Sequence, residues 1–231
     1  MTAARAGVPP THSQTLDRGV RVLELIHEAE RPLRSAELAR ALEVHRSIAY
    51  RVLRTLEAHR LVSRAPGGGW QLGVGLAVLA RGVQPSLDAA ATPELVALAN
   101  DVGLTAFLAV ADGAECVTLL SVEPRESQVH VATRPGRRHP LDRGGPGIAL
   151  LAGGPVLPGE RAEVAAARKA GHAHTRGEVV VGLSSVAAPV LSARDGVVAS
   201  LAVLFLDESA DVEALARRVR RAAAVVASRL P

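Results

Sequence analysis

The sequence of 231 residues has a single cysteine, Cys116, and only four Phe, Trp and Tyr residues in total. One cysteine cannot form an internal disulfide, and without a CxxC pair it cannot begin a zinc site of the usual kind. Aromatic side chains are the platforms on which proteins stack the bases of RNA and single-stranded DNA, so their scarcity argues against that mode of binding. The scarcity of aromatic residues does not exclude double-stranded DNA as a partner.

Long apolar runs are also missing. The longest, at residues 148–152 and 200–206, fall far short of the ~20 residues that span a bilayer, and residues 1–15 lack the apolar segment of a signal peptide. We therefore expect a protein without a membrane anchor in the reducing cytoplasm. The apolar fraction of 48% is high enough for aliphatic cores of Ala, Val and Leu, and the length suggests two domains.

The excess of positive over negative charge is confined to the N-terminal third. Nearly all basic residues of the chain are arginines, because Lys169 is the only lysine. Residues 1–82 contain 12 arginines and seven acidic residues, a net charge of +5, whereas residues 83–231 have a net charge of −1. Such localised basicity is the electrostatic footprint of a module that binds a polyanion. A solvated arginine-rich surface would give the same net charge. The spacing of the arginines therefore has to decide between such a surface and a polyanion-binding module.

Short helices joined by a tight turn are predicted in this basic third. After a polar tail at residues 1–13, which we expect to be disordered, an amphipathic helix ends before Pro32. Ser35 then stands as the expected N-cap of a second helix. Three residues, 43–45, separate that helix from a third one that begins near Arg46, and this spacing is typical of a helix-turn-helix.

The third helix, with the sequence RSIAYRVLRTL, carries two patterns. One side has Ala49, Val52, Leu53 and Leu56 at helical spacing, and the other has Ser47, Tyr50, Arg51 and Arg54. Strand candidates at 61–64 and 70–72 follow, joined by a turn with Pro66 and three glycines. This order of elements predicts a winged helix-turn-helix, whose second paired helix lies in the major groove. The residues expected to contact DNA are Ser35, Arg46, Ser47, Tyr50, Arg51, Arg54 and Arg64.

The remainder predicts a linker and an α+β domain. A linker helix is expected to run to about Val83, and a new helix to open with Thr92 as N-cap and Pro93 at its first position. Expected strands and helices then alternate, with strands at 105–112, 115–123, 128–133 and a pair within 186–207, and with helices at 147–153, 160–171 and from Asp211 onward. Hairpin strands mixed with helices suggest an antiparallel sheet flanked by helices. The expected divisions are a tail at 1–13, a DNA-binding domain at 14–75, a linker helix at 76–91 and a further domain at 92–231.

These residues resemble the IclR family of bacterial transcription regulators. The first domain is similar in TLDRGVRVLELI, SAELARAL, RSIAYRVLRTLEAHRLV and WQLGVGLAVLARG, and the second in HPLDRGGPGIALLAG and GEVVVGLSSVAAPVLSARDGVVASLAV. The resemblance implies a winged helix, a dimerising linker helix and a GAF-like domain that binds a small-molecule effector. It also implies a homodimer or dimer of dimers on a double-stranded DNA operator, and commonly a small carboxylate or aromatic acid as the ligand.

The same resemblance implies an effector pocket at six positions. These are Gly147, Thr175, Leu183, Ser185, Ala202 and Leu204. Two serines of the family pocket fall on Ala202 and Leu204, and a buried carboxylate without donors is costly. We therefore expect an effector with an apolar or aromatic body in preference to glyoxylate or pyruvate. A pocket too degenerate to bind anything, in a domain that only oligomerises, is the alternative.

Enzyme and cofactor chemistry find little support. The glycines at 145 and 147 begin a GxG, but Leu150 stands where a dinucleotide motif needs its third glycine, and no P-loop Gly-Lys-Ser or Gly-Lys-Thr occurs. His172 and His174 form an HxH near Glu178, a pair that is more often incidental than a metal site. No GxSxG or SxxK motif surrounds a serine, so we expect neither an enzyme nor a cofactor. A small-molecule enzyme fused to a DNA anchor is the weakest alternative.

Overall fold

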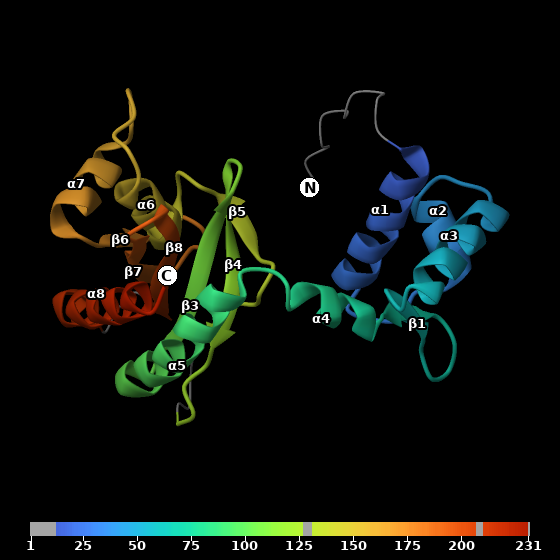
Figure 1. Ribbon diagram of the computed structural model, residues 1–231, viewed down its shortest axis with the longest axis horizontal. Coiled ribbons are helices and arrows are strands. Elements are labelled where there is room, and N and C mark those ends of the chain that lie inside the picture. Colours follow the sequence, from blue (N-terminus) through green and yellow to red (C-terminus); the bar gives the residue numbers. More distant parts are fainter. Residues whose placement is uncertain (1–12, 127–130, 207–209, 231) are drawn as a thin grey trace. The chain divides into compact units, whose positions relative to one another are not determined.

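The computed structural model describes residues 13–126, 131–206 and 210–230, and the chain divides into two compact units, Met1–Val83 and Gln84–Pro231 (Figure 1). The disordered tail expected at residues 1–13 lies outside the described residues, except for Ser13. The Ser13 hydroxyl accepts a hydrogen bond from the Leu16 amide and caps the first helix. Among the described residues no helix is both long and apolar enough to cross a membrane.

The first unit is a three-helix cluster followed by a β-hairpin and a short helix. Its elements are α1 (Gln14–Glu28), α2 (Ser35–Ala41), α3 (Arg46–Ala58), β1 (Val62–Arg64), β2 (Trp70–Leu72) and α4 (Val74–Ala80). One apolar core joins the three helices to the hairpin, with Val22, Leu38, Leu53 and Trp70 fully enclosed. This is the winged helix-turn-helix order that the sequence predicts.

The expected cap of α2 is wrong by one residue. The N-cap is Arg34, whose backbone N–H donates to the Glu37 carboxylate at 2.8 Å, and Ser35 is the first helical residue. The Ser35 hydroxyl instead accepts a hydrogen bond from the indole N–H of Trp70. Ser35 therefore joins the helix-turn-helix to the hairpin.

The expected linker helix also needs correction. Helix α4 ends at Ala80, and α5 (Pro85–Val102) begins seven residues before Thr92, so Pro93 lies inside a helix instead of opening one. Pro85 takes the first helical position, where a missing N–H costs nothing. The helix continues through Pro93 because its buried residues, among them Leu87 and Leu95, pack against the second unit's sheet.

The second unit is built on a six-stranded antiparallel sheet with the order β5-β4-β3-β8-β7-β6. Its strands are β3 (Thr105–Asp112), β4 (Glu115–Val122), β5 (Arg138–Pro140), β6 (Ala173–Arg176), β7 (Leu183–Ser192) and β8 (Gly196–Leu206). The expected strand at 128–133 lies partly outside the described residues, and residues 131–133 form no strand. Strands β5 and β6, which the sequence reasoning missed, are the short edges of the sheet.

Helices cover both faces of this sheet. The α5 and α8 (Val212–Ser228) helices share the larger core with Leu108, Leu201 and Val203. On the other face, α6 (Gly144–Gly153) and α7 (Ala162–Ala170) pack over Phe107 and Ala202. The architecture is the predicted α+β class with an antiparallel sheet flanked by helices, and α6, α7 and α8 lie where the sequence places them.

Candidate DNA-binding surface and ligand pocket

Helix α3 has the two faces that its sequence predicts. Ala49, Val52, Leu53 and Leu56 are buried, whereas Arg46, Ser47, Tyr50, Arg51 and Arg54 are exposed. Tyr50 keeps 47% of its surface accessible, so its hydroxyl can reach a ligand. The exposed residues form a polar, basic stripe along one helix, suited in residue type to phosphates and base edges.

The arginines of this stripe differ in their local pairing. Among the described residues, no acidic side chain lies within ion-pair distance of Arg51. Arg54 donates to Glu57 at 2.8 Å, and Arg64 on the hairpin lies 4.0 Å from the same carboxylate. Arg51 is thus open to a ligand, whereas phosphate would have to compete with Glu57 for the other two guanidinium groups.

The hairpin holds Arg64 through a chain of contacts. The Arg64 guanidinium carbon lies 3.7 Å from the centre of the Trp70 ring, a cation–π arrangement. Trp70 is fully buried, and its indole N–H donates to Ser35 Oγ at 2.9 Å. A rigid aromatic ring therefore orients the exposed arginine of the wing, and Ser35, whose expected DNA contact stays a prediction, holds that ring in place.

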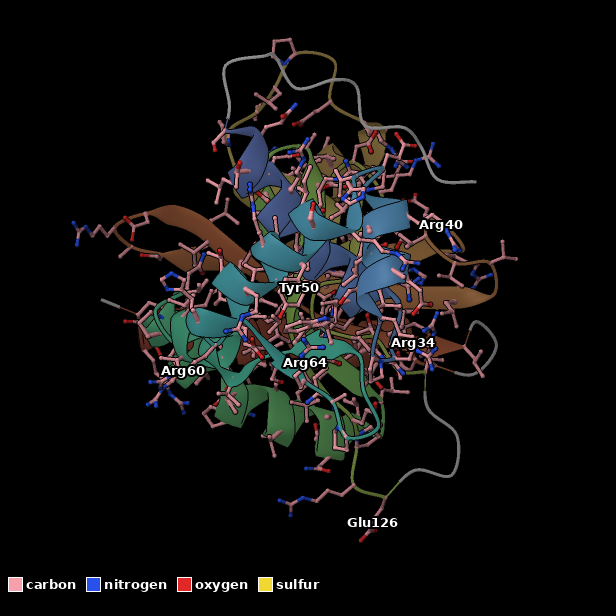
Figure 2. All side chains as sticks on the ribbon, turned by 90° about the vertical axis from the view of Figure 1, so that its right-hand side faces the viewer. Arg34, Arg40, Tyr50, Arg60, Arg64 and Glu126 are labelled. Carbon is pink, nitrogen blue, oxygen red and sulfur yellow. The ribbon has the colours of Figure 1, made fainter. Side chains whose placement is uncertain are left out.

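Additional basic residues surround the stripe. Figure 2 labels Arg34, Arg40 and Arg60 beside Tyr50 and Arg64 on the side of the first unit that faces the viewer. All three arginines are exposed. The sequence analysis does not include them among the expected DNA contacts because they lie outside the third helix, and only the net charge of +5 in this region points to them.

The second unit holds a partly open cavity of about 50 Å³ on the α6 side of its sheet. This is room for roughly four water molecules. Phe107 and Leu204 line it from the two central strands, Thr118 and Arg137 from the β4–β5 side, and residues of β6 and β7 from the other side. The lining thus combines apolar side chains with a smaller number of polar and charged ones.

Four of the six residues expected in the pocket line this cavity, namely Thr175, Leu183, Ser185 and Leu204. Gly147 and Ala202 do not. A Cβ at Gly147 would lie 2.3 Å from the Leu141 carbonyl oxygen, so that glycine is needed for the approach of α6 to its own entry loop. Ala202 is covered by the core beneath α6 and α7. The sequence reasoning missed Phe107, Arg137, His139 and Glu178.

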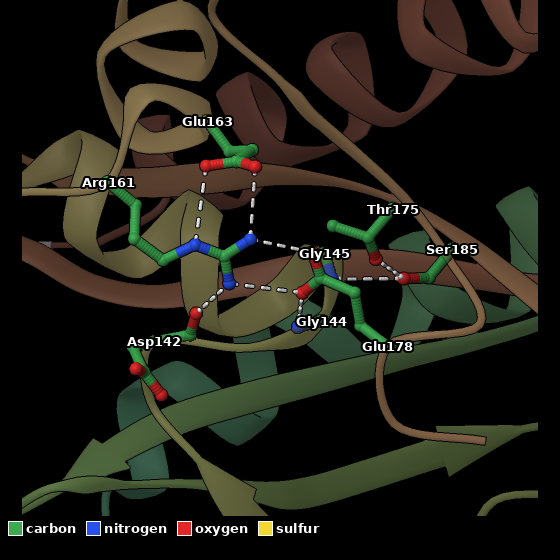
Figure 3. A network of polar contacts seen from close by, with 8 residues as sticks. All are labelled: Asp142, Gly144, Gly145, Arg161, Glu163, Thr175, Glu178 and Ser185. Carbon is green, nitrogen blue, oxygen red and sulfur yellow. Dashed lines mark hydrogen bonds and ion pairs between the residues drawn. The ribbon is translucent and has the colours of Figure 1, made fainter.

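The start of α6 is closed by side chains from β7 and from the loop before it (Figure 3). The Gly145 N–H donates to Ser185 Oγ at 3.1 Å, and the Ser185 and Thr175 hydroxyls lie 3.1 Å apart. The Gly144 N–H donates to the Glu178 carboxylate at 2.8 Å. A Cβ at Gly145 would lie 2.6 Å from Ser185 Oγ, so only glycine allows this contact.

Glu178 shares one guanidinium group with a second carboxylate. Arg161 contacts Glu178 at 2.8 Å and Glu163 at 3.2 Å, and it also donates to the Asp142 carbonyl oxygen. Hydrogen bonding from Arg161 lowers the pKa of Glu178 below its usual value, so this carboxyl is ionised at neutral pH. Two carboxylates on one guanidinium leave the network with a net negative charge at the edge of the cavity.

Cys116 and His174, which were considered for enzyme or metal chemistry, have other surroundings in the structure. Burial raises the pKa of the Cys116 thiol to about 12, which keeps it a protonated core residue. The His174 ring stacks on Phe205, with ring centres 6.4 Å apart. Within the described ranges, no three His, Cys, Asp or Glu side chains come together as a metal site would require.

Comparison with known proteins identifies the fold and the first unit. Residues 15–66 match the family model of the IclR helix-turn-helix domain. The chain is 31% identical over 161 residues to "Probable transcriptional regulator SauR" of Cupriavidus necator, an alignment that spans 68% of this chain and 64% of that protein.

Solved structures align over nearly the whole chain. An IclR transcriptional regulator from Alicyclobacillus acidocaldarius has a TM-score of 0.80 and 26% identity, covering 95% of this chain and all of its own. An IclR homolog from Microbacterium hydrocarbonoxydans, complexed with 4-hydroxybenzoate, has a TM-score of 0.82 and 25% identity, covering 94% of this chain and 99% of its own. All three relatives are described as transcriptional regulators or as IclR homologs. The chain belongs to the IclR family of transcription regulators.

Proposed function

We propose that this protein is a sequence-specific regulator that binds an operator in double-stranded DNA through α3 and senses a small organic acid in its second unit. The exposed Ser47–Tyr50–Arg51 stripe within the family's helix-turn-helix carries the proposal. Arg51 can bind guanine O6 and N7 with two hydrogen bonds, while Ser47 and Tyr50 donate to phosphates. Arg64 on the wing adds a phosphate contact.

Two copies of the helix-turn-helix unit should bind DNA together. Helix α4 buries none of its residues, and its Val78 and Leu79 are 67% and 65% exposed. An exposed apolar helix face of this kind favours association with a second copy. A homodimer would place two α3 helices on two half-sites, which is how small helix-turn-helix units reach high affinity.

The ligand we propose is an acid with an aromatic or other apolar body, acting in the cytoplasm. Phe107, Leu183 and Leu204 offer apolar contact. Arg137, which forms no ion pair with any residue that the structure describes, offers a counter-charge. The family member complexed with 4-hydroxybenzoate supports this choice of ligand. The small volume of the cavity and the apolar Leu204 favour the second candidate, a domain that only oligomerises.

The proposed sequence-specific DNA binding can be tested by letting the full-length protein select duplexes from a random pool. We expect enrichment of one motif with two related half-sites about 10 bp or a multiple of this apart. Recovery of random sequence after repeated rounds would contradict sequence-specific binding. Adding aromatic acids to the selected complex then separates the two candidates, because a domain that only oligomerises predicts no change in DNA affinity with any acid.

A further inference from the structure

A carboxylate lies among the arginines that are expected to contact DNA. Glu57, in the last turn of α3, accepts a hydrogen bond from Arg54 at 2.8 Å, and its other oxygen lies 4.0 Å from Nε of Arg64 on the hairpin. The side chains of Arg54 and Arg64 are 61% and 50% exposed, whereas that of Glu57 is 28% exposed. Glu57 is therefore a partly buried acid between two exposed arginines, one from the helix and one from the hairpin.

Arg64 has little freedom to move away from this carboxylate. Its guanidinium carbon lies 3.7 Å from the centre of the Trp70 ring, and Trp70 is fully buried. The indole N–H of Trp70 donates to the Ser35 hydroxyl at the start of α2, which fixes the orientation of the ring. The place of Arg64 is therefore set by the ring beneath it and by Glu57 beside it.

The other arginines of α3 differ from Arg54 in their pairing. Among the described residues, no acidic side chain lies within ion-pair distance of Arg46 or Arg51. Both are exposed, so they can turn to meet a base edge or a phosphate. The surface thus combines arginines that are open to DNA with two, Arg54 and Arg64, that are held at one carboxylate.

Binding to non-operator DNA would require Arg54 and Arg64 to leave Glu57. Such binding rests on charge alone, so its affinity depends on how many cationic side chains reach a phosphate. No base contact places the protein at one position on the duplex, and each arginine has to move to the nearest phosphate. The Glu57 carboxylate would then lose its partners and face the negatively charged duplex. Glu57 therefore weakens binding to non-operator DNA.

An operator complex does not make the same demand. Contacts to base edges fix the position of the protein along the duplex, and the phosphates then lie at fixed places relative to α3 and the hairpin. A guanidinium has five N–H groups, and Arg54 uses one Nη group on Glu57 while Arg64 presents its Nε, so both keep N–H groups for a phosphate. Side chains that are already held in place also lose little freedom on binding.

We propose that Glu57 is a specificity-determining residue, which lowers the affinity for non-operator DNA and leaves the affinity for the operator nearly unchanged. It does so by holding one arginine of α3 and one arginine of the hairpin in a fixed arrangement. This inference rests on the proposed binding of an operator through α3, and it assigns the residue of that surface that disfavours other DNA.

The proposal can be tested by anisotropy titrations of the full-length protein with the selected duplex and with a scrambled duplex of the same length. Glu57→Gln keeps an oxygen that accepts from Arg54 but removes the charge. We expect this variant to bind the scrambled duplex about three- to tenfold tighter, since each exposed ion pair that DNA must break is worth only a few-fold in affinity. The salt dependence on this duplex should become steeper by about one ion. The affinity for the selected duplex should change by less than about twofold.

Glu28→Gln is the matched control. Glu28 is exposed at the end of α1 and forms no ion pair with any residue in the described ranges, so this variant makes the same change in net charge away from Arg54 and Arg64 along the chain. It should change the two affinities by the same factor. A folding defect would weaken both complexes, so tighter binding to the scrambled duplex alone cannot come from misfolding.

Arg54→Ala supplies a second test. It should weaken binding to the scrambled duplex more in the Glu57→Gln background than in the wild type, because only without the Glu57 charge is Arg54 free to bind a phosphate. Equal effects of Arg54→Ala in both backgrounds, or an equal change in both affinities for Glu57→Gln, would overturn the role of Glu57 alone. A wild type that binds the selected and the scrambled duplex equally would overturn the proposed sequence-specific binding as well.

Discussion

Glu43, in the turn between α2 and α3, has a φ of 54° in the left-handed region. For residues with a Cβ this conformation costs roughly 1–2 kcal/mol, whereas glycine adopts it freely. We expect Glu43→Gly to raise the free energy of unfolding by about 0.5–1 kcal/mol, since glycine's greater entropy in the unfolded chain offsets part of the gain. Urea unfolding at constant pH measures the change.

Glu43→Ala is the control for this prediction. Alanine also removes the carboxylate but keeps a Cβ, so it should bring no comparable gain in stability. Equal stabilisation by both substitutions would mean that charge, and not backbone strain, is the cause.

Glu178 is also a stability determinant at the scale of one residue. Its hydrogen bond from Arg161 lowers its pKa in the folded state relative to the unfolded state. The contribution is therefore present above the unfolded value of about 4.3 and is lost as the pH falls through the folded pKa. We expect Glu178→Gln to be less stable than wild type at pH 7, with the difference shrinking toward pH 3. Denaturant titrations across this range measure it, and a constant difference would contradict the pairing.

Among the elements, α4 carries the clearest prediction. Its Val78 and Leu79 are exposed, and α4 buries none of its residues within the first unit. If they form a dimer interface, Leu79→Glu should raise the dimer dissociation constant at least tenfold, because burying a carboxylate there is costly. Light scattering at micromolar concentration should give twice the 24.0 kDa chain mass for wild type and a lower mass for the variant.

Leu157→Glu supplies the control for α4. Leu157 is 52% exposed in the loop between α6 and α7, so the substitution adds the same charge at another apolar surface position. It should leave the mass unchanged. A monomeric wild type, or a Leu79→Glu variant as dimeric as wild type, would contradict the role of α4.

An element is predicted well from the sequence when the residues that determine it are close together in the chain. The two faces of α3 are set by local spacing, and they are confirmed. The start of α5 was wrong because packing of Leu95 on the sheet outweighs the local signal of Pro93. Strand β6 was missed because a four-residue edge strand, held by pairing with Ser185 and its neighbours, has little signal of its own.

The residues that line the ligand cavity are also only partly predictable from the sequence. Leu204 and Ala202 lie two residues apart on one strand and one face, yet only Leu204 reaches the cavity, since α6 and α7 cover Ala202. That difference depends on how a helix approaches the sheet. Glu178 and Arg137 come from connections between elements, where sequence spacing does not fix which side chains meet.

At the scale of the whole molecule, the proposed function links the two units. The proposed regulator needs ligand binding in the second unit to change DNA affinity in the first, and such a coupling is reciprocal. DNA bound by the protein should therefore change the affinity for the acid by the same factor. Any such coupling first requires that α3 contacts DNA.

The most direct test of the account is therefore the DNA affinity of Arg51→Ala, measured by anisotropy on the selected duplex at several salt concentrations. We expect a loss of roughly 1–3 kcal/mol if Arg51 contacts a base, or a salt dependence shallower by about one ion if it contacts phosphate. Arg217→Ala, which removes an exposed arginine from α8, should change neither quantity. Unchanged affinity and unchanged salt dependence for Arg51→Ala would contradict the placement of α3 in the major groove.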